Sequence, residues 1–143
     1  MENKFQKKCK KLDISDMQNA IKSFASQIEE SFLIMKDWEP KDISIEIRNI
    51  LVIGMGGSAI GGDLVKTLTQ NDCRIPIHVN RSYNIPFWVN SHTLVIVSSY
   101  SGNTEETISA YLKIKNVNCR KIVISTGGEI SDCARKDNLE YIS

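Results

Sequence analysis

Apolar positions recur every three or four residues in the first quarter of the chain, which predicts an amphipathic helix. The stripe consists of Met17, Ile21, Phe24, Ile28, Phe32 and Met35. Ser15 or Asp16 can cap the start of one continuous helix. It should end before Trp38, because Pro40 disfavours helical geometry in the residue before it. Since such a stripe needs an apolar partner, we expect this helix to pack on the domain that follows.

From residue 49 onward, short β-branched runs alternate with stretches of helical length, which is typical of a parallel sheet with crossover helices. The predicted strands cover residues 49–53, 75–80, 93–98, 121–125 and 139–142. The predicted helices cover residues 58–70, 104–115 and 130–136. A loop through Pro86 joins the second and third strands.

Right-handed crossovers of this kind wind into an open sheet, and five strands commonly take the order 2-1-3-4-5. The sequence therefore predicts an α/β, three-layer, doubly wound parallel sheet over residues 46–143, preceded by a tail and helix over residues 1–45. In this order the first and third strands are neighbours whose connections leave to opposite faces. The crevice at their carboxyl ends is the expected binding site.

The first strand leads into a glycine-rich bend, Gly54 to Asp63. Its glycines let a ligand come close to the backbone, and Ser58 brings a hydroxyl to the N-terminus of a helix. By itself this signal is weak. Gly54, Gly56 and Ala59 also satisfy the dinucleotide-binding pattern G-x-G-x-x-G/A, so that alternative has to be weighed.

A site for NAD would need an acidic residue near the end of the second strand, where Asn80, Arg81 and Ser82 stand instead. Arg81 could meet the 2′-phosphate of NADP, so an NADP-binding domain stays open as an alternative. A phosphate-binding P-loop is excluded because Gly62 occupies the lysine position. The hydrolase pattern G-x-S-x-G around Ser58 fails because it ends on Ile60.

The third strand leads into a second bend, Ser99 to Thr107, which contains several hydroxyls together with Gly102 and Asn103. It lies before a predicted helix, where unpaired N–H groups and the positive end of the helix dipole favour an anion. Alternatively, Ser101 or Thr104 merely caps that helix. Capping a helix needs only one hydroxyl. Three hydroxyls at this spacing therefore favour an uncharged binding site for a phosphate.

Composition is that of an ordinary globular protein, with 143 residues, 41% apolar and 24% charged. The 18 basic and 17 acidic residues leave a net charge of +1, which offers no general field for nucleic acid or a membrane surface. The lysines before residue 12 are interpreted as a solvated tail. The aliphatic runs 50–53 and 94–97 are too short to span a membrane, and no secretory signal is apparent.

The four cysteines show no C-x-x-C spacing, and there are two histidines, so no metal site is expected. Reduced thiols fit a cytoplasmic protein. Asp63 could serve a metal only with oxygen or nitrogen partners that the sequence does not group around it.

With both bends in view, the chain resembles the sugar isomerase (SIS) domain family, whose phosphosugar loop follows S-x-S-G-N-T-x-E-T. Residues 99–107 match every fixed position of this pattern. The first bend, Tyr100 within Ser-Tyr-Ser, and the stretch 81–86 (Arg-Ser-Tyr-Asn-Ile-Pro) resemble more narrowly the archaeal and bacterial bifunctional phosphoglucose/phosphomannose isomerases. The resemblance is clear from about Asn49 onward.

The resemblance implies a flavodoxin-like SIS fold, a homodimer, a hexose 6-phosphate substrate and no cofactor. It implies phosphate contacts from Ser58, Ser99, Ser101 and Thr104. Contacts to the rest of the substrate are expected from Gly56, Gly57, Gly102 and Asn103. A non-catalytic phosphosugar sensor is the main alternative, because SIS modules also occur in transcription regulators. The lack of a helix-turn-helix segment ahead of the domain argues against it.

Isomerisation of an aldose to a ketose moves a proton between adjacent carbons through an enediol, and it needs a base within hydrogen-bond reach. Glu105, Glu106, His78 and His92 are weak candidates for this role because of their expected positions in ordinary helix, strand and loop surfaces. In the family, a Glu and a His of a second SIS domain perform this chemistry. We expect those positions beyond Ser143, so that the chain is the substrate-binding half of a longer isomerase.

Overall fold

The computed structural model describes residues 11–36, 38–41 and 45–143. The chain divides after Pro40 into two compact units, Met1–Pro40 and Lys41–Ser143. The second unit carries both bends and all of the strands found among the described residues.

Residues 17–35 form two helices, α2 (Met17–Lys22) and α3 (Phe24–Met35), where one continuous helix was predicted. The break falls at Ser23, whose hydroxyl donates to the carbonyl of Ala20 at 3.1 Å. Its oxygen also accepts from Gln27 Nε2 at 3.0 Å. Backbone bonds still run through this residue, from Ser23 N to the carbonyl of Asn19 at 2.9 Å and from Gln27 N to the carbonyl of Ser23 at 3.0 Å, so the interruption is confined to one residue.

The predicted caps of the first helix are wrong. Asp16 is the residue that precedes α2, but it has a φ of 51° and makes no capping bond with its side chain. The Asp13 carboxylate caps the helix instead, accepting from the N–H of Met17 at 2.7 Å and of Gln18 at 2.8 Å. The lysine-rich tail, residues 4–11, lies almost wholly outside the described residues.

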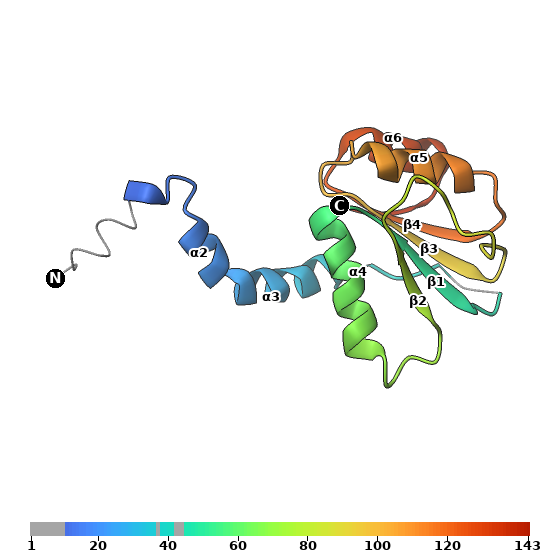
Figure 1. Ribbon diagram of the computed structural model, residues 1–143, viewed down its shortest axis with the longest axis horizontal. Coiled ribbons are helices and arrows are strands. Elements are labelled where there is room, and N and C mark those ends of the chain that lie inside the picture. The colour runs from blue at the N-terminus through green and yellow to red at the C-terminus, as the bar shows by residue number, and fades with distance from the viewer. Residues whose placement is uncertain (1–10, 37, 42–44) are drawn as a thin grey trace. The chain divides into compact units, whose positions relative to one another are not determined.

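The second unit is built on five parallel strands in the order β2-β1-β3-β4-β5, which confirms the predicted topology (Figure 1). The strands are β1 (Asn49–Ile53), β2 (Ile77–Asn80), β3 (Thr93–Ser98), β4 (Arg120–Ile124) and β5 (Glu140–Ile142). β2 starts two residues later than predicted, since Pro76 has no N–H to donate to the ladder. The carbonyl of Pro76 still accepts from Ile50 N at 3.0 Å.

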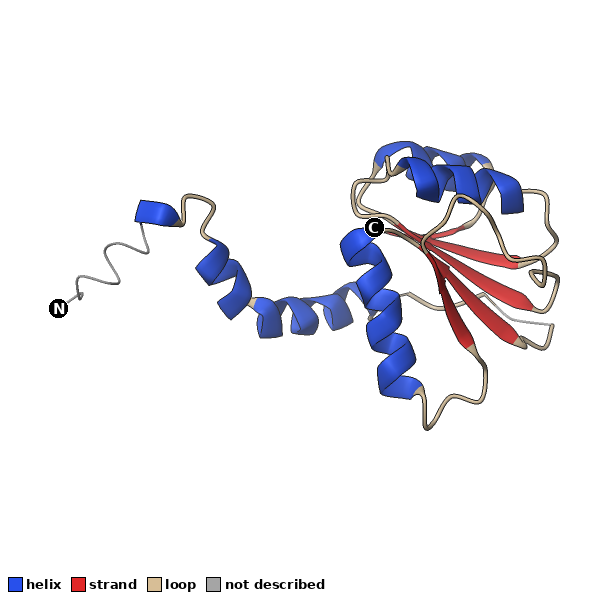
Figure 2. Cartoon of the chain, viewed as in Figure 1, coloured by secondary structure: helices blue, strands red, loops and turns tan. Residues whose placement is uncertain are grey.

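Helices cover both faces of the sheet, as Figure 2 shows in blue against the red strands. They are α4 (Gly56–Thr69), α5 (Glu105–Ile114) and α6 (Gly128–Lys136). Leu51 and Ile53 of β1 share a buried cluster with Tyr111 of α5. Val52 points the other way, where a Cβ on Gly62 of α4 would lie 2.9 Å from its Cγ1. The predicted three-layer fold is therefore confirmed.

The main core lies between the sheet and the layer formed by α5 and α6. Its large side chains have almost no exposed surface, and they are Leu51, Ile53, Val95, Val97, Tyr111, Ile114, Val123 and Ile130. Residues 81–92 connect β2 to β3 as an irregular loop, from which Ile85 and Val89 pack against this core. The loop thus replaces a crossover helix on that face.

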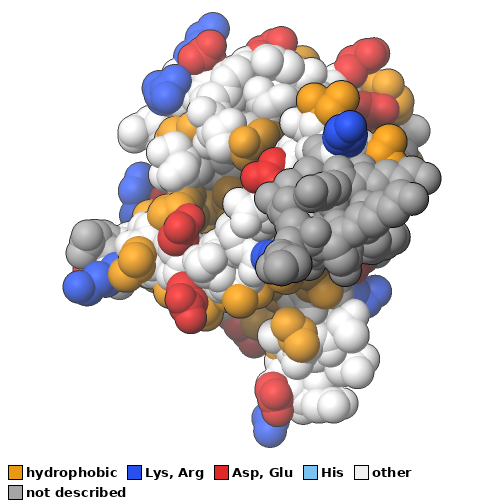
Figure 3. Space-filling model, turned by 90° about the vertical axis from the view of Figure 1, so that its left-hand side faces the viewer, with side chains coloured by type: hydrophobic (Ala, Val, Ile, Leu, Met, Phe, Trp, Pro, Cys, Tyr) orange, Lys and Arg blue, Asp and Glu red, His pale blue; other side chains and the backbone are white. Residues whose placement is uncertain are grey.

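The opposite face of the sheet is more open. Within residues 45–143, α4 is the one described helix that packs there, and Ile60, Leu64 and Leu68 along it are more than half exposed. A cavity of about 300 Å³ beside α4 is lined by apolar side chains that include Ile96 and Ile124. In Figure 3, which shows the molecule from the left-hand side of Figure 1, charged side chains of both signs are scattered over the described surface. None of the described helices is both long and apolar enough to cross a membrane.

Candidate functional site

The two bends meet at the carboxyl edge of the sheet, as the predicted strand order requires. β1 and β3 are paired along their length, with Ile53 opposite Val97. Just beyond these residues, the backbone N–H of Tyr100 donates to the hydroxyl oxygen of Ser58 at 3.2 Å. A cavity of about 690 Å³ opens at this junction. Hydroxyl groups dominate its polar lining, and they come from Ser58, Ser98, Tyr100, Ser101, Thr104, Ser125, Thr126 and Ser143.

The first bend depends on close approach of the backbone. A Cβ on Gly54 would lie 3.0 Å from the carbonyl oxygen of Ser98, so a side chain there would push β1 away from β3. Gly56 begins α4 with a φ of 51°, which favours glycine. A Cβ on Gly57 would meet nothing within 4 Å. Because Gly57 lines the cavity, its missing side chain leaves space open to a ligand.

The second bend is held by its own hydroxyls. Ser99 is only 2% exposed, and its Oγ accepts from Gly102 N at 3.1 Å and lies 3.1 Å from Thr104 Oγ1. The Ser101 hydroxyl oxygen accepts from Asn103 N at 3.3 Å. Thr104 precedes α5 but makes no capping bond with its side chain. The simple capping alternative therefore does not account for these hydroxyls.

Half of the predicted site residues line the cavity. They are Gly57, Ser58, Ser101 and Thr104. The others, Gly56, Ser99, Gly102 and Asn103, lie in the same two bends without lining it. Ser99 supports the bend from inside, and the side-chain oxygen of Asn103 accepts from Glu129 N at 3.0 Å. Contacts of all eight residues with a substrate stay predictions.

A third bend after β4 also contributes to the cavity, and the sequence reasoning missed it. Ser125 and Thr126 line the cavity, and Thr126 Oγ1 donates to the carbonyl of Tyr100 at 2.6 Å. Thr126 N donates to the same carbonyl at 3.3 Å. The sequence did contain a sign of this bend. Ser125 and Thr126 stand at the carboxyl end of the fourth predicted strand, which neighbours the third strand in the predicted order.

The side chains around the cavity offer hydrogen bonds rather than ionic charge, and two helix dipoles point at it. All the side chains that line it are uncharged. The helices α4 and α5 both begin beside it, at Gly56 and Glu105, and neither has a side-chain cap on its first N–H groups. These N–H groups carry the positive end of each helix dipole. The site is therefore suited to an anion with several acceptor oxygens.

The acidic residues that open α5 face another part of the domain. The pKa of Tyr83, in the β2–β3 loop, is raised by burial and further by the negative charges of Glu105 and Glu106. Lys113 ties the same loop to α5, donating to the carbonyl of Tyr83 at 2.8 Å. Neither glutamate lines the cavity.

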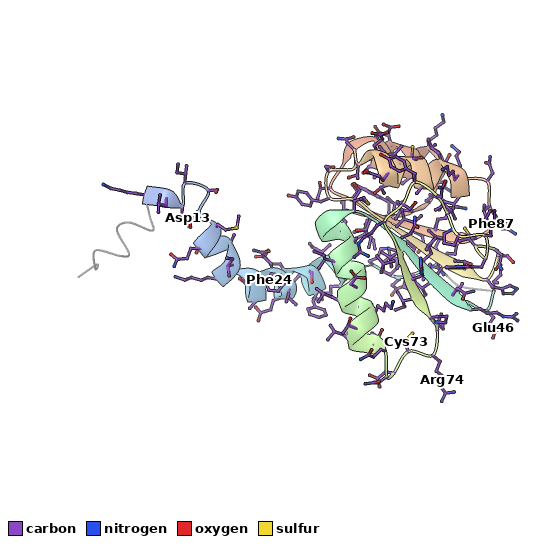
Figure 4. All side chains as sticks on the ribbon, in the orientation of Figure 1. Asp13, Phe24, Glu46, Cys73, Arg74 and Phe87 are labelled. Atoms are coloured by element: carbon purple, nitrogen blue, oxygen red, sulfur yellow. The ribbon has the colours of Figure 1, made fainter. Side chains whose placement is uncertain are left out.

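The other charged and imidazole candidates also lie outside the cavity lining. Arg81 forms an ion pair with Asp63 of α4. His78 packs edge-on against Trp88, with the ring centroids 5.8 Å apart. His92 Nδ1 lies 2.9 Å from the carbonyl oxygen of Glu46, which Figure 4 labels at the amino ends of the strands. None of them is positioned for proton transfer at the bends.

Comparison with known proteins identifies relatives over most of the chain, although no protein-family model matches it. The bifunctional phosphoglucose/phosphomannose isomerase of Caldicellulosiruptor bescii is 41% identical over 127 residues, which are 89% of the chain and 38% of that protein. The protein of the same name from Thermoplasma volcanium is 35% identical over 108 residues, or 73% of the chain and 34% of that protein. The chain thus spans little more than a third of the length of these relatives.

The fold comparison gives a consistent result. The C-terminal domain of glucosamine-fructose-6-phosphate aminotransferase from Francisella tularensis matches with a TM-score of 0.55 at 19% identity, over 67% of this chain and 28% of that chain. At 19% identity, this similarity shows that the two chains share a fold and nothing more. Taken with the sequence relatives and the loop at residues 99–107, it shows that the chain belongs to the sugar isomerase (SIS) domain family, related to the bifunctional phosphoglucose/phosphomannose isomerases.

Proposed function

We propose that the chain binds hexose 6-phosphates as the N-terminal half of an isomerase that interconverts glucose 6-phosphate or mannose 6-phosphate with fructose 6-phosphate. The observation that carries this proposal is the hydrogen bond between Tyr100 N and Ser58 Oγ, which joins two hydroxyl-bearing bends at one cavity. The names of the relatives from Caldicellulosiruptor bescii and Thermoplasma volcanium support the choice of sugar phosphates.

In the proposed complex, the phosphate oxygens accept hydrogen bonds from Ser58, Ser101 and Thr104. Each of these hydroxyls has a hydrogen to donate, and the N-termini of α4 and α5 add favourable dipoles. Ser99 acts in the same bend through its bonds to Gly102 N and Thr104 Oγ1. A cavity of about 690 Å³ is within the usual range of small-molecule sites, about 300–1,000 Å³.

The sugar lies beside Gly57 in this proposal, where a Cβ would meet nothing within 4 Å. Gly56 and Gly102 complete the bends that surround it. No carboxylate or imidazole side chain lines the cavity among the described residues, so in this proposal the base for enediol formation comes from outside this lining. In this proposal the domain binds substrate within a homodimeric, cytoplasmic enzyme, and further residues move the proton.

Calorimetric titration of the chain with glucose 6-phosphate and with glucose tests the proposal. We expect weak binding of the phosphorylated sugar and none of the free sugar. Ser101→Ala and Thr104→Val should each weaken binding by roughly tenfold, the cost of a hydrogen bond to a charged group. Thr69→Val is a matched control, because its hydroxyl only bonds to the carbonyl of Val65 in α4. Equal affinity for glucose and glucose 6-phosphate would refute the proposed site.

A phosphosugar sensor would pass the same binding test, so catalysis needs its own measurement. A chain that contains both the present residues and a second SIS domain should convert fructose 6-phosphate to aldose phosphates in a coupled assay. The present chain alone should show negligible turnover. If the longer protein binds the sugar phosphate but fails to isomerise it, the sensor alternative is favoured.

A further inference from the structure

The start of α6 is capped by the second bend rather than by a residue of its own. Gly127 precedes the helix and has no side chain to offer. Two of the first N–H groups of α6 are instead accepted by neighbouring residues of the second bend. Glu129 N donates to Asn103 Oδ1 at 3.0 Å, and Ile130 N donates to the carbonyl of Gly102 at 3.0 Å.

The contact between the second and third bends is also sterically tight. A Cβ on Gly102, where φ is 69°, would lie 1.7 Å from the carbonyl oxygen of Gly127. A Cβ on Gly128 would lie 2.5 Å from the carbonyl oxygen of Ser101 and 2.7 Å from Asn103 Oδ1. Main chains that approach so closely leave little freedom for either bend to move without the other.

Asn103 connects this contact to the cavity through its main chain. While its side chain caps α6, its backbone N–H donates to Ser101 Oγ at 3.3 Å. Ser101 lines the cavity, as does Thr104, the residue that follows Asn103. The bond from α6 to the Asn103 carboxamide therefore fixes Asn103, which stands in the chain between Ser101 and Thr104, two of the proposed phosphate-binding residues.

We propose that Asn103 is a positioning residue, which presents Ser101 and Thr104 to the phosphate by anchoring the second bend on the N-terminus of α6. This inference rests on the proposed function. It assigns Asn103 an indirect role in place of the substrate contact expected from the sequence. The phosphate is bound by the hydroxyls, and Asn103 fixes where these hydroxyls lie.

The main test substitution is Asn103→Leu, which keeps a similar volume but removes the acceptor. We expect glucose 6-phosphate to bind roughly tenfold more weakly, because the bend is no longer fixed in its binding geometry. Amide hydrogen exchange at Glu129, measured by NMR without ligand, should become several-fold faster. Asn103→Asp retains an acceptor oxygen and should restore slow exchange at Glu129. Asn103→Asp also adds a negative charge that repels phosphate, so this variant is judged by its amide exchange and not by its affinity for glucose 6-phosphate.

Ser131→Ala is the matched control for loss of stability. The Ser131 hydroxyl donates to the carbonyl of Gly127 at 2.6 Å and lies 3.1 Å from Tyr141 OH, so its removal lowers stability while leaving in place the bonds from Glu129 N and Ile130 N to the second bend. Phosphate affinity should stay near that of the wild type. All titrations are performed on the full 143-residue chain well below the melting temperature of each variant. Asn103→Ala replaces Asn103→Leu if the latter does not fold.

The outcomes separate the two proposals. If the wild type prefers glucose 6-phosphate over glucose while Asn103→Leu binds it equally well, the positioning role is wrong and the proposed function stands. Equal weakening by Ser131→Ala and Asn103→Leu would also overturn the positioning role, because general loosening would then explain both. Fast amide exchange at Glu129 in Asn103→Asp would likewise overturn the positioning role, because an acceptor oxygen at this position would then not protect the N–H of Glu129. A wild type that does not distinguish the two sugars overturns both proposals.

Discussion

Ser58 and Tyr100 are 42 residues apart in sequence, yet the backbone N–H of Tyr100 donates to the Ser58 hydroxyl oxygen at 3.2 Å. This bond joins the helix that follows β1 to the bend that follows β3. The Ser58 hydroxyl keeps its own hydrogen for another acceptor, because here it serves only as an acceptor. It can thus link the two bends and donate to a ligand at once.

Gly57→Ala should weaken binding of the sugar phosphate without lowering the stability of the domain. A Cβ at this position meets nothing within 4 Å and lies within the first turn of α4, so we expect no loss of melting temperature. Because Gly57 lines the cavity, the added methyl group should weaken glucose 6-phosphate binding by roughly tenfold. Calorimetry and thermal melting of the same preparation measure both effects.

Gly61→Ala is the control for that substitution. Gly61 is in the same helix, its Cβ would also meet nothing within 4 Å, and it does not line the larger cavity. Alanine in a helix interior stabilises by about 0.5–1 kcal/mol relative to glycine. The control should raise the melting temperature and leave affinity unchanged. Unaltered binding by Gly57→Ala would place the sugar elsewhere.

The topology followed from the sequence because β-branched runs and helical stretches alternate cleanly from Asn49 onward. The third bend was missed because Ser125 and Thr126 carry no motif of their own and join the site only through the pairing of β3 with β4. The inward position of Ser99 could have been predicted. It continues the alternation of Thr93, Val95 and Val97, all of which are fully buried.

The break between α2 and α3 illustrates what periodicity cannot predict. The apolar stripe runs through both helices without interruption, so it contains no sign of a boundary at Ser23. The break is confined to Ser23, whose ψ of 2° departs from helical geometry, and its side-chain bonds to Ala20 and Gln27 are local contacts that the apolar pattern does not record. Likewise, the capping role of Asp13 depends on a turn at Asp16 with positive φ, a conformation that few non-glycine residues adopt.

Gly102→Ala should strongly destabilise the domain. The residue has a φ of 69°, and an added Cβ would lie 1.7 Å from the carbonyl oxygen of Gly127. Strain at positive φ and the backbone collision act together, so we expect the free energy of unfolding to fall by at least about 2 kcal/mol. Urea denaturation followed by circular dichroism measures this change. A variant as stable as the wild type would mean that the two bends can move apart.

Asp137→Asn should lower stability at neutral pH and have little effect in acid. The Asp137 carboxylate accepts from Lys115 Nζ at 2.8 Å and from the hydroxyl of Tyr111. The bond from Lys115 first, and then that from Tyr111, hold the pKa of Asp137 below its ordinary value. The stabilisation is therefore complete above the unfolded pKa, about 3.9, and is lost as the pH falls through the lower folded pKa.

Thermal melting at pH 7 and at pH 2 tests this sign. The melting temperature of Asp137→Asn should fall below that of the wild type at pH 7, and the two should converge at pH 2. Asp132→Asn provides a control on α6, since Asp132 pairs with Arg135 in an exposed position where ion pairs contribute little. A difference that persists at pH 2 would show that the carboxylate charge is not the cause.

The apolar stripe of α3 offers a last test, because Phe24, Ile28 and Phe32 are all exposed where this helix is described. A helix of 12 residues is marginal by itself in water. The packing of this stripe on residues 46–143 stays a prediction from its pattern, and a stability measurement tests it. Phe32→Ala should then lower the stability of the full chain by roughly 1–3 kcal/mol in urea denaturation. Glu30→Ala, on the polar side of α3, should change it by less than about 0.5 kcal/mol. Equal stability of Phe32→Ala and the wild type would show that the helix does not contribute to folding of the domain.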